Sequence, residues 1–280
     1  MKLQIRDEYS PLKAVIVGTG KSVPLYETYR KSKMDYRKED PSTKPYDKRL
    51  LEKQQARFLN VLQEHNVKLL MVKEDKKLPW QMWTRDTGFV YGNTFFYCLK
   101  RGLKEREGEF ESIKHHFSKN LRQIVCIKNG KLEGGDVVVD KDIIFIGMSR
   151  RTDDEAVKVV EKYFPVKRLN LGNSVMHLDT RMTILPNNYV LIYPRAFQKE
   201  DLKYLQKRFS FIPVTKKEAQ TLGTNVFVIN PKTIVVDKTH SRIHKELRKR
   251  KFQLEIVDYS ESRRLEGSFR CTTLPVEREY

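Results

Sequence analysis

The chain has 280 residues, of which 39% are hydrophobic and 10% aromatic, a composition typical of a globular protein with a substantial core. Its formal net charge of +19 would suit a nucleic-acid-binding protein, but the basic residues are spread along the chain and match no zinc-finger or RRM-type motif. No apolar run approaches the roughly 18 residues of a membrane helix. We therefore expect a cytoplasmic protein that binds neither nucleic acid nor membranes.

The predicted strands occur in pairs at regular intervals. Four hairpins are predicted, over residues 88–97, 137–146, 182–192 and 225–236. Their first strands are 48, 45 and 44 residues apart, counted from Phe89, Val137, Met182 and Val226. This regular spacing predicts internal repeats.

Amphipathic helical patterns separate the hairpins. Apolar residues share one helical face in three runs, at residues 110–117, 156–163 and 202–209. A longer helix is predicted over about 48–64. The first strand, 13–17, has no hairpin of its own, but a strand at about 270–274 can complete a fifth unit with it. The whole chain, 1–280, would then be one ring without a domain boundary. Segment 18–47 is predicted as a long loop and a candidate lid.

Three short runs, far apart in the chain, share one chemical theme. They are Leu132-Glu133-Gly134-Gly135-Asp136, Met176-His177-Leu178-Asp179-Thr180 and Phe269-Arg270-Cys271-Thr272-Thr273. A thiol, an imidazole and carboxylates are the groups needed for nucleophilic attack on a cationic carbon. Taken singly, each run has a plainer interpretation as a turn before a strand, a hydrogen-bonded histidine or a small buried cysteine. Their joint occurrence favours the chemical interpretation.

The three cysteines form neither a CxxC pair nor a metal-ligand spacing, so the sequence predicts no disulfide framework and no metal site. Apolar neighbours predict that Cys98 and Cys126 are inert core thiols. Cys271 differs from them because it follows Arg270 and a loop rich in arginine, glutamate and glycine.

With these motifs the chain resembles the guanidino-group-modifying enzymes of the pentein fold, which include arginine deiminases, dimethylarginine dimethylaminohydrolases and amidinotransferases. The matching motifs follow the family's order and are Glu8–Lys13, Thr84–Asp86, Glu133–Val137, Ile146–Thr152, His177–Thr180 and Arg270–Pro275. The resemblance implies an α/β fold, a five-bladed propeller of pseudo-fivefold repeated ββαβ units, with the site on its axis.

The resemblance also implies a role for individual residues. Cys271 is the nucleophile, His177 the general acid and base, and Glu133 the carboxylate that orients the imidazole. Asp86 and Asp179 are the anions that grip the substrate. Two carboxylates can hold a planar guanidinium by charge-assisted hydrogen bonds while a thiolate approaches its central carbon.

Two arginines match family positions that bind a substrate α-carboxylate. They are Arg101 and Arg151, for which solvated surface arginines are an equally good interpretation in so basic a chain. A cation near the thiol is expected to lower its pKa, and protonated His177, Arg270 and the substrate itself are the candidates.

The sequence therefore predicts a hydrolase without a cofactor that acts on arginine or a related small cationic guanidine and gives citrulline or an analogue. Two alternatives stay open. An amidinotransferase would use the same groups with an amine in place of water. A non-catalytic pentein binding protein would have no need of Cys271, His177 and Glu133 together. A homodimer is compatible with the sequence.

Overall fold

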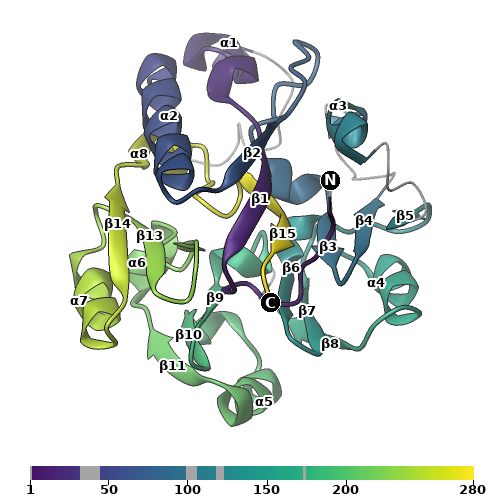
Figure 1. The fold of residues 1–280 in the computed structure, drawn as a ribbon, viewed down its shortest axis with the longest axis vertical. Coiled ribbons are helices and arrows are strands. Elements are labelled where there is room, and N and C mark those ends of the chain that lie inside the picture. Colours follow the sequence, from purple (N-terminus) through teal and green to yellow (C-terminus); the bar gives the residue numbers. More distant parts are fainter. Residues whose placement is uncertain (1, 32–44, 99–105, 118–122, 173–174) are drawn as a thin grey trace.

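The computed structural model describes residues 2–31, 45–98, 106–117, 123–172 and 175–280. Its strands form five separate three-stranded sheets. Figure 1 shows these sheets around the centre of the molecule, with the helices outside them. The fold is therefore mixed α/β, as the sequence predicts.

Four of the sheets are consecutive units of the chain. In each unit, two antiparallel strands form a hairpin and the second of them pairs in parallel with a third strand. The units are β3 (Phe89–Tyr91), β4 (Thr94–Cys98) and β5 (Ile124–Ile127); β6 (Val137–Asp140), β7 (Ile143–Met148) and β8 (Val166–Asn170); β9 (Met182–Leu185), β10 (Tyr189–Ile192) and β11 (Ser210–Pro213); and β12 (Phe227–Val228), β13 (Thr233–Asp237) and β14 (Gln253–Val257). All four predicted hairpins are confirmed.

Helices lie between the second and third strands of these units. They are α3 (Glu111–Lys114), α4 (Asp154–Glu161), α5 (Lys199–Arg208) and α7 (Ser241–Lys249). Two shorter helices, α6 (Lys216–Gln220) and α8 (Ser260–Arg264), lead toward the next unit. In α4 the residues Ala156, Val157 and Val160 are buried. The predicted apolar face over 156–163 is therefore only partly confirmed, because Val159 is partly buried and Tyr163 lies beyond the helix and is 52% exposed.

The fifth sheet joins the two ends of the chain. β1 (Leu12–Val17) pairs antiparallel with β15 (Thr273–Arg278) and parallel with β2 (Lys68–Met71). The helix α2 (Lys48–Glu64) precedes β2 and has the predicted bounds. Closure of a fifth unit by the last strand is confirmed, although this strand begins at Thr273 and not at Arg270. The Thr273 hydroxyl bonds the carbonyls of Phe269 and Arg270, which holds the preceding residues in a turn.

The predicted loop over 18–47 is only partly a loop. Its described part contains the 3-10 helix η1 (Gly20–Ser22) and α1 (Tyr26–Lys31), whereas residues 32–44 lie outside the described residues. The far end of the segment is fixed, because the buried Tyr46 donates its hydroxyl to the Pro24 carbonyl at 2.6 Å and Asp47 caps α2.

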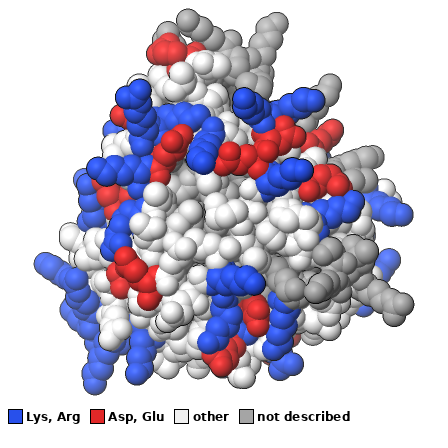
Figure 2. All heavy atoms as spheres, turned by 45° about the horizontal axis from the view of Figure 1, so that its top comes forward, with Lys and Arg blue, Asp and Glu red and all other residues white. Residues whose placement is uncertain are grey.

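The surface mixes charges of both signs. On the face drawn in Figure 2, lysines and arginines stand beside aspartates and glutamates. Arg168, for example, lies 2.6 Å from Asp154 and 2.8 Å from Glu161. Across the described ranges, no helix is long and apolar enough to cross a membrane.

Candidate active site

The segments that precede the first strands of the sheets meet one another. Three of them are 3-10 helices: η3 (Thr84–Thr87) before β3, η7 (Gly134–Asp136) before β6 and η8 (Leu178–Thr180) before β9. η7 contacts both η3 and η8, and η3 contacts β15. Because the units repeat, the residues before each first strand reach the same region. The structure thereby brings together Asp86, Glu133, His177, Asp179 and Cys271, all of them buried.

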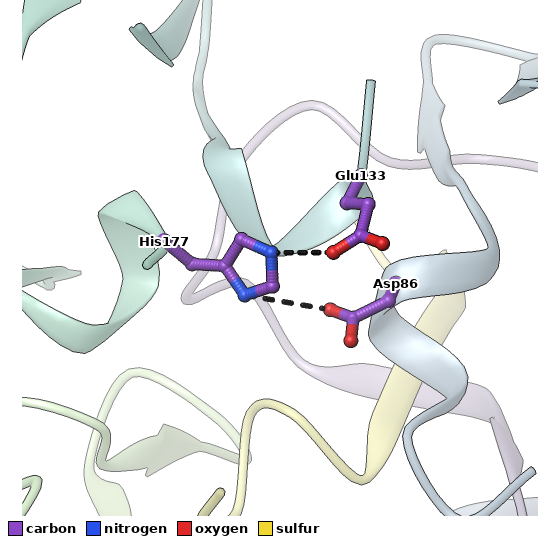
Figure 3. A group of neighbouring side chains, drawn as sticks. All are labelled: Asp86, Glu133 and His177. Atoms are coloured by element: carbon purple, nitrogen blue, oxygen red, sulfur yellow. Dashed lines mark hydrogen bonds and ion pairs between the residues drawn. The ribbon is translucent and has the colours of Figure 1, made fainter. Parts of the chain in front are cut away.

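His177 lies between two carboxylates, as Figure 3 shows. Its Nε2 is 2.7 Å from Oε2 of Glu133, and its Nδ1 is 3.7 Å from Oδ1 of Asp86. Burial by itself would lower the pKa of His177, but the charge of Asp86 and the hydrogen bond with Glu133 raise it to about 9. The imidazole is therefore protonated at neutral pH and can donate from both nitrogens.

Glycine at position 135 permits this close arrangement. A Cβ there would lie 2.6 Å from Nδ1 of His177 and 2.9 Å from Oδ1 of Asp86, which is too close for any side chain. The next residue, Asp136, accepts hydrogen bonds from two hydroxyls and from the backbone N–H of Leu178 at 3.1 Å. Asp136 thus ties η7 to η8.

The thiol of Cys271 is buried, with 6% of the residue exposed. Its Sγ lies 3.9 Å from Oδ2 of Asp179 and 3.5 Å from Nδ2 of Asn225. Burial, and then the negative charges of Asp179 and Asp86, raise the pKa of this thiol well above its ordinary value. These surroundings therefore favour the neutral thiol.

The two arginines nearest the thiol in sequence and space are both buried. The Arg85 guanidinium acts against the aspartates and lowers the pKa of Cys271. Arg85 also donates from Nε to the Arg270 carbonyl at 3.3 Å, and its backbone N–H donates to the Cys271 carbonyl at 3.2 Å. The guanidinium of Arg270 turns instead to Glu8, at 3.0 and 3.1 Å.

Asp86 and Asp179 each present one carboxylate oxygen that makes no hydrogen bond to a described residue. Oδ1 of both residues is buried and makes no hydrogen bond within the described part of the chain. The other oxygen is engaged, since Oδ2 of Asp86 accepts from Arg106 at 2.7 Å and Oδ2 of Asp179 faces the Cys271 thiol. A buried carboxylate oxygen without a donor is costly, so these two oxygens suit a ligand rich in N–H groups.

The structure tests the position of only one of the two arginines that were predicted to bind a carboxylate. Arg101 lies outside the described residues. The side chain of Arg151 is only 12% exposed, and its Nη1 lies 3.7 Å from Oε1 of Glu133. Arg151 therefore borders the site and is not a solvated surface residue.

A third arginine, Arg106, was missed by the sequence analysis. Its side chain is 2% exposed, and its guanidinium bonds Asp86, Glu109 and the Trp83 carbonyl. The only sequence signal is the spacing of Arg106 and Glu109, which places the two charges three residues apart. That spacing is common on exposed helices, so it does not by itself indicate a buried pair.

Asp86, Glu133 and His177 could also be considered as metal ligands. Each offers one ligand atom, and these atoms lie within 4.8 Å of one another. A metal would have to displace the proton of an imidazole whose pKa is about 9, and would compete with Arg106 for Asp86. The group therefore fits acid–base chemistry better than metal binding.

A buried thiol, a charged imidazole and paired carboxylates at the centre of five repeated α/β units define the class. The protein is a member of the pentein superfamily of guanidino-group-modifying enzymes. Residues 29–278 match the family model described as N,N dimethylarginine dimethylhydrolase, eukaryotic, and the chain belongs to that family.

Similar proteins agree with this assignment. A Bacillus subtilis protein, the uncharacterised YkgA, is 31% identical over 281 residues, covering 99% of this chain and 96% of the relative. The fold matches the N-terminal domain of the cyanobacterial arginine dihydrolase ArgZ with a TM-score of 0.82 at 20% identity, covering 95% of this chain and 97% of that one. It also matches the amidinotransferase SxtG from Microseira wollei with a TM-score of 0.81 at 17% identity, covering 99% and 98%.

Proposed function

We propose that the protein is a cysteine-dependent hydrolase of arginine-type guanidines, which releases ammonia or an alkylamine and forms citrulline or an analogue. One observation carries the proposal. Asp86 and Asp179 both hold a buried Oδ1 that makes no hydrogen bond within the described residues, although Oδ1 of Asp86 also faces Nδ1 of His177 at 3.7 Å, and both residues lie beside the reacting groups. A guanidinium is planar and cationic, and its N–H groups can satisfy both oxygens at once.

The charges of the site explain how a neutral thiol becomes a nucleophile. The negative charges of Asp86 and Asp179 contribute to the high pKa of Cys271. A bound guanidinium offsets both charges, so the thiol releases its proton to solvent as the substrate binds. The thiolate therefore forms next to the carbon that it attacks.

The reaction then proceeds in two halves. The sulfur of Cys271 bonds to the central carbon, His177 gives its proton to the departing amine, and the C–N bond breaks to leave an amidino-thioester. Neutral His177 next takes a proton from water, and the resulting hydroxide bonds to the carbon. The C–S bond then breaks as the proton of the new hydroxyl passes to the sulfur, which gives the ureido product and the neutral thiol. Glu133 holds the imidazole through Nε2 in both halves.

The arginines at the edge of the site suit an amino-acid substrate. Arg151 lies at the border of the site beside Glu133. We propose that it binds the α-carboxylate, with Arg101 as a second candidate. We further propose that the five units form one five-bladed α/β propeller over residues 1–280, which the repeated sheet topology and the likeness to ArgZ support.

The second candidate function is amidinotransfer. The likeness to SxtG supports it, because the same fold also occurs in an amidinotransferase. An amidinotransferase would use the thiol, the imidazole and the carboxylates in the same roles, but an amine would take the place of water as the acceptor.

One experiment separates the functions. The protein is incubated with arginine, monomethylarginine or dimethylarginine, with and without glycine or ornithine, and both the amine and the ureido product are measured. A hydrolase gives equal amounts of both products without an acceptor. Turnover only with an added amine, with the amidino group on that amine, would show a transferase. No turnover of any guanidine would favour a binding protein.

A further inference from the structure

Asn225 occupies, in the fourth unit, the position that the proposed site residues occupy in the other units. It lies two residues before β12, as Cys271 lies two residues before β15 and Asp86 three residues before β3. The residue is 1% exposed. Nothing in its local sequence marks it, but the repeat places it at the common centre.

We propose that Asn225 is a catalytic residue, which stabilises the thiolate of Cys271 by donating an N–H···S hydrogen bond. The inference rests on the proposed function only in taking Cys271 as the nucleophile. It adds an uncharged polar group to the acids and bases that the resemblance assigns.

The orientation of the Asn225 amide is fixed by the backbone. Its Oδ1 accepts from the N–H of Arg270 at 2.9 Å, and its Nδ2 donates to the carbonyl of Asp179 at 3.0 Å and to Sγ of Cys271 at 3.5 Å. A backbone N–H only donates and a carbonyl only accepts, so the reversed amide would lose both bonds. The sulfur therefore faces an N–H group and not the amide oxygen.

This hydrogen bond favours the anionic form of the sulfur. A neutral thiol is a weak acceptor, whereas a thiolate accepts a charge-assisted bond. Burial and the charges of Asp179 and Asp86 act in the opposite direction and raise the pKa of Cys271. An uncharged donor suits this position, because a cation there would pair with the aspartates and compete with a cationic substrate.

Thr224 provides a matched control for the structural part of this arrangement. Its hydroxyl donates to the Thr180 carbonyl at 2.6 Å, and its own carbonyl accepts from the Thr183 hydroxyl at 2.6 Å. Asn225 and Thr224 both link the segment before β12 to η8. The substitution Thr224→Val thus removes a buried hydrogen bond between these two segments. It does not touch the sulfur.

The test measures the rate of alkylation of Cys271 by iodoacetamide against pH, with the adduct located by peptide mass spectrometry. Asn225→Ala and the isosteric Asn225→Asp should raise the midpoint of this profile by about one pH unit or more, so that alkylation below the midpoint slows roughly tenfold. Thr224→Val should keep the wild-type midpoint. An unchanged midpoint in folded Asn225 variants, or an equal shift in Thr224→Val, would overturn the proposal.

A second measurement needs no Asn225 variant. In wild-type protein labelled with ¹⁵N-asparagine, one side-chain amide signal should titrate with the alkylation midpoint, and that titration should vanish in Cys271→Ala. If no asparagine side-chain signal follows the thiol, the hydrogen bond is absent. Neither measurement requires turnover, so both can fail or succeed independently of the guanidine hydrolase assay.

Discussion

Glu8 and Arg270, which are 262 residues apart in the sequence, form a buried ion pair with two hydrogen bonds of 3.0 and 3.1 Å. Arg270 directly precedes Cys271, so the N-terminal segment holds the turn that carries the thiol. Burial would raise the pKa of Glu8, but the charges of Arg270 and Arg85 lower it to about 2. The carboxylate is therefore ionised at every pH at which the fold is expected to persist.

The substitution Glu8→Gln should destabilise the protein, because it removes the hydrogen-bonded counterion of the buried Arg270 and leaves only Asp179, 4.0 Å from its Nε. We expect a loss of roughly 3–5 kcal/mol in the free energy of unfolding at neutral pH, measured by urea denaturation. Glu279→Gln is the control, since Glu279 pairs with Lys13 at the exposed surface and should contribute about 1 kcal/mol or less. Equal losses in the two variants would contradict this account.

The same pair predicts a dependence of stability on acid. The folded pKa of Glu8 is depressed, so its contribution is complete above its ordinary value of 4.5 and is lost as the pH falls from 4.5 toward 2. In Glu8→Gln the free energy of unfolding should fall less steeply over that window than in wild type. Parallel pH profiles of the two proteins would rule out the effect.

Replacing Cys271 by Ala should abolish turnover and leave the fold intact, because the proposed mechanism has no other nucleophile. Cys98→Ala and Cys126→Ala should keep activity apart from some loss of packing, since these residues lie on β4 and β5. Steady-state kinetics check the three variants together. A Cys271→Ala protein with a tenth of the wild-type kcat would exclude covalent catalysis by this thiol.

Asp86→Asn and Asp179→Asn should each reduce kcat/KM for a cationic guanidine by orders of magnitude, because each removes a charge from a buried site. Each should also lower the pKa of Cys271, since both aspartates raise it. The alkylation rate of the thiol at neutral pH should therefore rise while turnover falls. Variants in which both rates fall together would instead indicate general disruption of the site.

The pH above which activity declines should be set by the pKa of His177. Its pKa of about 9 lies above the ordinary 6.5, and kcat/KM depends on the protonated imidazole, so activity should decline above about pH 9. Glu133→Gln removes an anion that raises this pKa, so the alkaline limb should move to lower pH. Asp142→Asn changes an exposed carboxylate and should leave the limb in place. A limb that stays fixed in Glu133→Gln would assign it to another group.

The raised pKa of His177 also has a consequence for stability. A group whose folded pKa is raised contributes its full stabilisation below the ordinary value, and this contribution is lost as the pH rises. For His177 the loss should extend from about pH 6.5 to pH 9. Urea denaturation across that range, compared with His177→Asn, tests the contribution. A variant that keeps the wild-type slope would show that another group is responsible.

Arg106→Met should weaken substrate binding by releasing the Oδ2 of Asp86 that Arg106 holds at 2.7 Å. It should also cost roughly 3–5 kcal/mol of stability, because Glu109 and Asp86 lose a buried counterion. Arg168→Met is the matched control, since Arg168 also pairs with two carboxylates but its side chain is 30% exposed, so the loss should be about 1 kcal/mol or less. A similar, small cost for both substitutions would show that the buried pair is unimportant.

The sequence alone was sufficient for the repeated hairpins and for α2. These elements depend on local patterns, namely alternating or continuous apolar runs and turn residues such as Asn187 and Asn188, which adopt positive φ angles of 60° and 58°. The third strands of the units did not show this pattern. β8, for example, is Val-Lys-Arg-Leu-Asn and has one buried residue, so only its parallel pairing with β7 makes it a strand.

The motifs likewise predicted a site from a thiol, an imidazole and carboxylates, whose residue types are rare in such combinations, and the structure places these buried groups close together. Other relationships exist only in the folded chain. Glu8 reaches Arg270 and Asn225 reaches Cys271 because separate units bring the ends of their first strands to one centre. The pKa of His177 also depends on the folded chain, since it is set by burial and by the charges of Asp86 and Glu133. These effects act through space and cannot be inferred from the residues next to His177 in the sequence.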